Sequence, residues 1–123
     1  MQAARLFRQD LEAVTFAPPA IGVLSNYTGE LHEVEPDSIR TRLFFQLFNP
    51  VNWLGCLNTA NSAQIGTYIE FGGGLGAEEG PAAKRPNLES IIRKTVKVAG
   101  GEARHVAAIN SETLRSAAAA FAG

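Results

Sequence analysis

Residues 72–77 are the first candidate for a functional loop, because their sequence Gly-Gly-Gly-Leu-Gly-Ala matches the dinucleotide-binding pattern G-x-G-x-x-G/A and follows an expected strand. A loop that binds phosphate must continue directly into a helix whose first amides point at the anion. Here residues 78–81, Glu-Glu-Gly-Pro, follow instead, and two carboxylates would repel the phosphates. We therefore interpret Gly72, Gly73 and Gly74 as a backbone turn that requires positive φ. A small nucleotide-binding domain is the alternative.

Histidine, cysteine and serine are the other residue types that could support catalysis or bind a metal. His32 lies in an expected loop and His105 at the start of an expected strand, and neither has the spacing to other His or Cys residues that a metal site needs. We interpret His32 as a solvated loop side chain and His105 as a partly buried structural residue. No serine stands in a G-x-S-x-G elbow, the strained turn that exposes a nucleophile. The sequence therefore shows no metal site and no nucleophile with its base.

Basic residues gather in one expected helix of the second half of the chain. Arg93, Lys94 and Lys97 fall in its last turn, and Lys84 and Arg85 precede it. Charges at such positions usually form a solvated helix face. The alternative is a binding site for an acidic partner or a phosphate.

Hydrophobic periodicity predicts three helices and one strand in the first half of the chain. Pro36 suits the first position of the second helix, and Asn49 followed by Pro50 would cap and begin the third. The predicted elements are a helix over residues 3–14, a strand over 21–24, and helices over 36–48 and 50–66.

The second half of the chain is predicted to contain two strands and two helices. Asn87 would cap the first of these helices and Asn110 or Ser111 the second. The apolar side of the first helix would consist of Leu88, Ile91, Ile92 and Thr95. The predicted elements are a strand over residues 67–71, an irregular loop over 75–86, a helix over 88–99, a strand over 105–109 and a helix from 111 onward.

Strands that alternate with helices in this order are typical of an α/β fold with a mostly parallel sheet. We therefore predict an α/β architecture of the three-layer type, with about three strands covered by helices, as a single domain over residues 1–123. Three strands make a thin sheet, because parallel sheets normally contain several strands and bury both faces. We expect additional strands to come from elsewhere.

Composition narrows the class of protein further. The chain has 123 residues, of which 46% are hydrophobic and 19% charged, with one cysteine, Cys56, and a net charge of -1. One cysteine excludes a disulfide framework, and the balance of charge argues against a general nucleic-acid-binding surface. No apolar stretch approaches the roughly 20 residues of a membrane-spanning helix, and the first residues do not resemble an export signal. We expect a cytoplasmic protein that does not bind a membrane.

Three stretches of the chain, taken in order, are more specific than any of these features. They are Val-Leu-Ser-Asn at residues 23–26, Phe-Gln-Leu-Phe-Asn-Pro-Val-Asn-Trp at 45–53 and Tyr-Ile-Glu-Phe-Gly-Gly-Gly at 68–74. Together they resemble the carboxy-terminal part of the malonyl-CoA:acyl carrier protein transacylase family, which shows a strand ending in Ser-Asn, then Gln-Leu-x-x-Pro-Val-x-Trp, then Glu-x-Gly-Pro-Gly. Gly73 departs from the pattern, since the family has proline there.

The resemblance implies an α/β-hydrolase-like large subdomain and a reaction of fatty-acid or polyketide biosynthesis. A serine in Gly-His-Ser-x-Gly takes the malonyl group from malonyl-CoA with a histidine as base, and the phosphopantetheine thiol of an acyl carrier protein then accepts it. Both motifs would lie before Met1, so we expect the chain to be inactive without the remainder of the acyltransferase domain. Gln46 matches the residue whose backbone carbonyl orients the catalytic imidazole. No bound cofactor is implied.

A second interpretation is a non-catalytic module that keeps the fold and docks an acyl carrier protein or a transferase. Arg93, Lys94 and Lys97 would then form the docking surface. Carrier proteins are typically acidic, so electrostatic steering would favour such an encounter.

Overall fold

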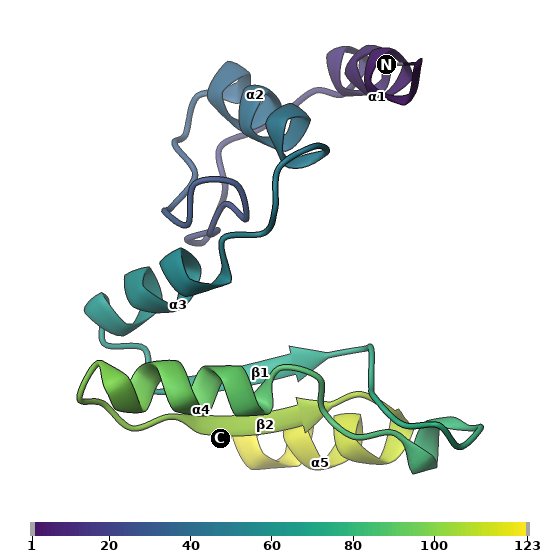
Figure 1. Cartoon of the computed structure of the whole chain (residues 1–123), viewed down its shortest axis with the longest axis vertical. Helices are drawn as coiled ribbons and strands as arrows, with labels where there is room; N and C mark the ends of the chain where they lie inside the picture. The colour runs from purple at the N-terminus through teal and green to yellow at the C-terminus, as the bar shows by residue number, and fades with distance from the viewer. Residues whose placement is uncertain (1, 123) are drawn as a thin grey trace. The chain divides into compact units, whose positions relative to one another are not determined.

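The computed structural model describes residues 2–122, and the chain divides into two compact units, residues 1–60 and 61–123 (Figure 1). The first unit is built from helices, and the second contains helices and a parallel sheet. The class is therefore mixed α/β, as predicted, while the single domain over residues 1–123 stays a prediction. None of the described helices is both long and apolar enough to cross a membrane.

The first unit contains α1 (Gln2–Ala13), α2 (Pro36–Gln46) and most of α3 (Trp53–Ser62). Helices α1 and α2 contact each other, and each contributes a buried apolar residue, Leu11 and Ile39. Arg40 links them, since its Nε donates to the Leu11 carbonyl at 3.1 Å and its guanidinium lies 5.3 Å from the centre of the Phe16 ring. Arg40 thus satisfies one of the backbone acceptors that the end of α1 leaves without a helical partner.

The strand predicted over residues 21–24 is wrong. Among the described residues this segment forms one isolated antiparallel bridge, Leu24 with Leu31, and the Ile21 side chain is 79% exposed. The extended run ends at Ser25, whose Oγ accepts hydrogen bonds from the amides two and three residues later. An apolar run becomes a strand where neighbouring backbone pairs with it, and here a local turn folds the chain back instead.

The third helix begins later than predicted because a different asparagine caps it. The Oδ1 of Asn52 accepts from the Gly55 amide at 3.0 Å, which is the geometry of a helix N-cap. Asn49, the predicted cap, instead donates from Nδ2 to the Phe45 carbonyl at 2.7 Å, at the end of α2. The two asparagines therefore have separate roles: Asn49 bonds the end of α2, and Asn52 caps the start of α3.

The second unit is organised around two parallel strands, β1 (Thr67–Phe71) and β2 (Arg104–Ala108). Helix α4 (Glu89–Val98) covers one face of this sheet, and α5 (Ser111–Phe121) packs against β2 from the other (Figure 1). The short 3-10 helix η1 (Pro81–Ala83) is part of the loop that connects β1 to α4. The sheet of the described residues thus has two strands rather than about three.

Local signals place the last helix correctly. Asn110 is its cap: the Oδ1 of Asn110 accepts from the Thr113 amide at 2.8 Å, and the Oγ1 of Thr113 accepts from the Asn110 amide at 3.0 Å. Ala117 of α5 is buried, as is Ala108 at the end of β2. The reciprocal cap fixes where α5 starts and so brings its small apolar face onto β2.

Candidate functional site

Gln46 lies in a turn that side chains fasten to the backbone at the end of α2. Its Nε2 donates to the Asn49 carbonyl at 3.1 Å, and the Nδ2 of Asn49 donates back to the Phe45 carbonyl at 2.7 Å. The Leu47 amide donates to the Phe44 carbonyl at 3.2 Å, so the helix ends in one tighter turn. The backbone of this turn is fixed from both sides of Gln46.

Two oxygen atoms of Gln46 have no donor within the part of the chain that the structure describes. Oε1 is buried and has no hydrogen-bond partner. The backbone carbonyl oxygen accepts none of the hydrogen bonds formed among residues 2–122. Because a helix leaves its last carbonyls without partners, this oxygen remains able to accept a hydrogen bond from outside the chain. That is the property that the predicted role of Gln46 requires.

Aromatic rings pack around the same turn. The ring centroids of Tyr27 and Phe45 lie 5.6 Å apart in a stacked pair, and those of Phe45 and Phe48 lie 5.8 Å apart edge to face. Phe44 and Phe48 form another edge-to-face pair at 5.2 Å. Such pairs stabilise beyond the area they bury. They support the turn, while Phe45 and Phe48 remain exposed beside it.

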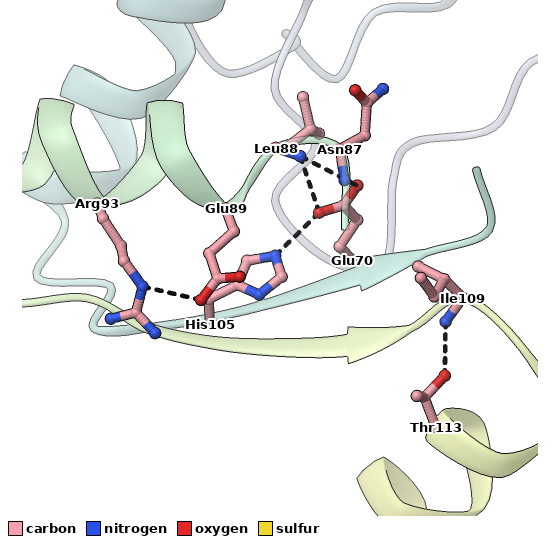
Figure 2. Close-up of polar contacts among 8 residues, drawn as sticks. All are labelled: Glu70, Asn87, Leu88, Glu89, Arg93, His105, Ile109 and Thr113. Atoms are coloured by element: carbon pink, nitrogen blue, oxygen red, sulfur yellow. Dashed lines mark hydrogen bonds and ion pairs between the residues drawn. The ribbon is translucent and has the colours of Figure 1, made fainter. Parts of the chain in front are cut away.

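The second unit contains a buried polar cluster between the sheet and α4 (Figure 2). Glu70 of β1 accepts from the Asn87 amide at 2.8 Å and from the Leu88 amide at 3.1 and 3.2 Å. Its Oε2 also lies 2.9 Å from the Nε2 of His105 on β2. The side chains of Glu70 and His105 are 7% and 2% exposed. A carboxylate from a strand therefore replaces the expected Asn87 cap at the start of α4.

The surroundings of Glu70 favour its charged form. Burial alone would raise the pKa of its carboxyl, but the amides of Leu88 and Asn87 and the His105 ring together lower that pKa below its usual value. The positive end of the α4 dipole lies at the same place. The cluster holds β1, β2 and the start of α4 together. We therefore interpret it as structural, and His105 in it is partly buried, as predicted.

Sequence reasoning did not assign this role to Glu70. A signal was present, because Glu70 is a charged residue in the middle of an apolar strand that precedes a glycine run. A buried carboxylate needs partners, and its partners lie 17 to 35 residues further along the chain. The pairing between β1 and β2 is what brings His105 to Glu70.

His32 is less solvated than expected. Its Nδ1 is buried without a hydrogen-bond partner among the described residues, and burial together with the nearby Arg42 cation lowers the pKa of its imidazole. His32 does lie in a loop, as predicted, but its side chain is half-buried rather than solvated. Nowhere in residues 2–122 do three His, Cys, Asp or Glu side chains group as metal ligands would.

The glycine run after β1 forms a turn in left-handed backbone geometry. The φ angles are 67° at Gly72, 68° at Gly73 and 114° at Gly74. The loop beyond is closed by Lys84, whose Nζ donates to the carbonyls of Gly76 and Glu78 at 2.6 Å each. No helix begins directly after the run, since α4 starts only at Glu89. The context that a dinucleotide-binding loop requires is thus missing.

The three basic residues predicted as a binding set share the outer side of α4. Arg93, Lys94 and Lys97 are all exposed, and Arg93 is paired with Glu89 at 3.0 Å through its Nε. Arg93 and Lys97, one turn apart, line an open hollow of about 480 Å³ together with residues 101–103. The structure brings Arg93 and Lys97 to this hollow and places Lys94 beside it on the helix.

No protein-family model and no curated protein sequence matches the chain. Among solved structures, the chain matches a malonyl-CoA:acyl carrier protein transacylase of Xanthomonas oryzae pv. oryzae with a TM-score of 0.68 and 24% sequence identity. The match covers 99% of this chain and 34% of that chain. The fold is similar to part of that enzyme. The chain spans about a third of the length of the transacylase, and at this identity the likeness concerns the fold alone.

Proposed function

We propose that the chain is the carboxy-terminal segment of a malonyl-CoA:acyl carrier protein transacylase and works as part of that acyltransferase domain. The observation that carries the proposal is the fold match, which extends over 99% of the chain. The exposed apolar side chains of β1, Ile69 at 39% and Phe71 at 70%, agree with a sheet that continues into further polypeptide. The Gln-Leu-x-x-Pro-Val-x-Trp stretch at the end of α2 agrees with the same family.

In the proposed reaction the chain supplies support rather than a reacting group. A serine of the adjoining polypeptide attacks the thioester carbonyl of malonyl-CoA, a histidine takes the hydroxyl proton, and coenzyme A leaves as the thiol. The carrier-protein thiol then attacks the malonyl ester and frees the serine. The Gln46 carbonyl accepts from the imidazole and thereby fixes the tautomer that acts as base. Malonyl-CoA is a substrate here, and the proposal needs no bound cofactor.

The proposal predicts that malonyl labelling depends on the adjoining polypeptide. The purified chain, incubated with radiolabelled malonyl-CoA, should acquire no covalent label, because it contains no G-x-S-x-G elbow. The same chain joined to the polypeptide encoded in frame upstream should acquire one label per chain and pass it to an acyl carrier protein. A stoichiometric ester on the chain alone, or an upstream sequence without Gly-His-Ser-x-Gly, would overturn the proposal.

A second candidate function is a docking module for an acidic carrier protein, favoured by the exposed cations along the hollow on α4. This candidate predicts that the isolated chain binds an acyl carrier protein in a calorimetric titration, and more weakly at high salt because exposed charges are screened. The Lys94→Glu, Lys97→Glu variant should lose that binding, and Arg115→Glu, a charge reversal at an exposed position of α5, is the control. Binding that is absent at low salt would exclude this candidate.

A further inference from the structure

We propose that the side chains of Gln46 and Asn49 are positioning residues, which fix the direction of the Gln46 carbonyl and through it the imidazole of the catalytic histidine. The inference rests on the proposed function, but it adds residues to it. The resemblance gives a role to the backbone of Gln46 alone, and it gives no role to Asn49. The hydrogen bonds at the end of α2 indicate a structural role for both side chains.

A reciprocal pair of side-chain hydrogen bonds spans the turn. The Gln46 side chain donates to the carbonyl three residues ahead, at Asn49, while the Asn49 side chain donates to the carbonyl four residues behind, at Phe45. The two bonded carbonyls flank the Gln46 carbonyl on either side in the sequence. A helix end usually frays, because its last carbonyls have no helical partners. Here side-chain amides bond the carbonyls before and after Gln46, and the carbonyl of Gln46 itself is left available.

The planar peptide bond between Gln46 and Leu47 sets the direction of the Gln46 oxygen. The Gln46 carbonyl and the Leu47 amide belong to one rigid peptide unit, in which the C=O and N–H point in opposite directions. The Leu47 amide donates to the Phe44 carbonyl at 3.2 Å. That bond directs the N–H back along α2 and therefore directs the Gln46 oxygen away from it. Fixing the turn fixes the direction of this acceptor.

Substitution separates this proposal from a role of the backbone alone. The Gln46→Ala variant keeps the carbonyl and loses Nε2, and the Asn49→Asp variant keeps the side-chain shape and loses the donor to Phe45. If the carbonyl were sufficient, both variants would behave as wild type. Asn58, exposed on α3, provides the matched control as Asn58→Asp. The same substitution at Asn58 alters none of the hydrogen bonds of the turn.

The first measurement uses the chain alone and follows amide hydrogen exchange at Leu47 and Phe48. We expect Gln46→Ala and Asn49→Asp to accelerate exchange at these amides about tenfold, the size of effect that one lost hydrogen bond produces. Asn58→Asp should leave both rates unchanged. Unchanged exchange in both turn variants would overturn the proposal, whatever the function of the chain.

The second measurement uses the chain joined to its upstream polypeptide and follows malonyl transfer to a carrier protein. We expect both variants to lower kcat about tenfold with little change in KM, as for one lost hydrogen bond to a charged imidazole. In Gln46→Ala, which adds no charge, the acid limb of the pH profile should move to lower pH, because a weaker acceptor for the imidazolium lowers the pKa of the histidine. Altered folding alone would not move that limb.

The two failures are distinguishable. Active wild type with unaffected kcat in both turn variants and an unaffected pH profile in Gln46→Ala would overturn the positioning role and leave the proposed function standing. No malonyl transfer by the joined wild-type chain would overturn the proposed function, and the positioning role with it.

Discussion

Replacing Glu70 by alanine should lower the free energy of unfolding of the second unit by about 3 kcal/mol, the size expected when a buried charged acceptor of several hydrogen bonds is removed. The variant leaves three donors without an acceptor, namely the Asn87 and Leu88 amides and the Nε2 of His105. It also removes the cap of α4. Urea denaturation followed by circular dichroism measures the loss, and hydrogen exchange in α4 locates it.

Glu79→Ala is the matched control, because Glu79 is an exposed glutamate in the loop after the glycine run. Its effect should stay within about 0.5 kcal/mol, as for most surface substitutions. Glu70→Gln should fall between the two, since a neutral amide still accepts hydrogen bonds but carries no charge for the helix dipole or for His105. Equal stability of Glu70→Ala and Glu79→Ala would show that the cluster does not stabilise the unit.

The same carboxylate makes stability depend on pH in a defined direction. Burial opposes the charged form of Glu70, but the amides of Leu88 and Asn87 and the ring of His105 outweigh it and lower the pKa of the folded state. This contribution is therefore complete above the unfolded pKa of about 4.3 and is lost as pH falls through the lower folded value. The stability difference between wild type and Glu70→Gln should accordingly shrink below about pH 4.

Local chemistry explains which elements the sequence predicts well. The run of β-branched and aromatic residues at 67–71 ends in glycines, and β1 has those bounds. Asn110 with Thr113 forms a cap within four residues. The apolar run at 21–24 has the same local signal as a strand, yet a strand also needs partners. The bonds of Ser25 direct this segment into a turn instead.

The candidate site was predictable to the same extent. The stretch around Gln46 is contiguous, so a motif identifies it, and both hydrogen bonds of the turn connect residues three and four apart. Glu70 was not predictable in this way, because His105 lies 35 residues later and reaches Glu70 only through the pairing of β1 and β2. Partners distant in sequence leave no spacing to detect.

The prediction of which side of helix α4 is buried was partly wrong for the same reason, a contact with a residue distant in sequence. Its predicted apolar side was Leu88, Ile91, Ile92 and Thr95. The structure buries Ile92, as predicted, together with Val96, which the prediction left out, and leaves the Ile91 side chain 40% exposed. A period of 3.6 residues fixes the spacing of an apolar stripe, but which stripe faces the sheet depends on how the helix is anchored. Glu70 anchors its first turn at Leu88. The rotation of the helix thus follows from a contact outside it.

The second prediction with a large expected effect tests this orientation of α4 by placing a carboxylate at a buried valine and at an exposed one. Val96 is 1% exposed and Val98 is 90% exposed, although they lie two residues apart in the same turn. Val96→Asp would bury a carboxylate with no partner, and since such changes cost more than about 4 kcal/mol, most of a marginally stable unit should unfold.

Val98→Asp places the same charge in the same helix, but at a position that is exposed to solvent. Its cost should be about 0.5 kcal/mol, mainly from a negative charge near the carboxyl end of the helix dipole. Thermal unfolding of both variants, with circular dichroism and hydrogen exchange in α4 and β2, measures the contrast. If α4 were rotated so that Ile91 and Thr95 faced the sheet in place of Val96, Val96→Asp would be tolerated nearly as well as Val98→Asp. A pair of equally mild effects would therefore refute the observed orientation of α4 and the anchoring by Glu70 that sets it.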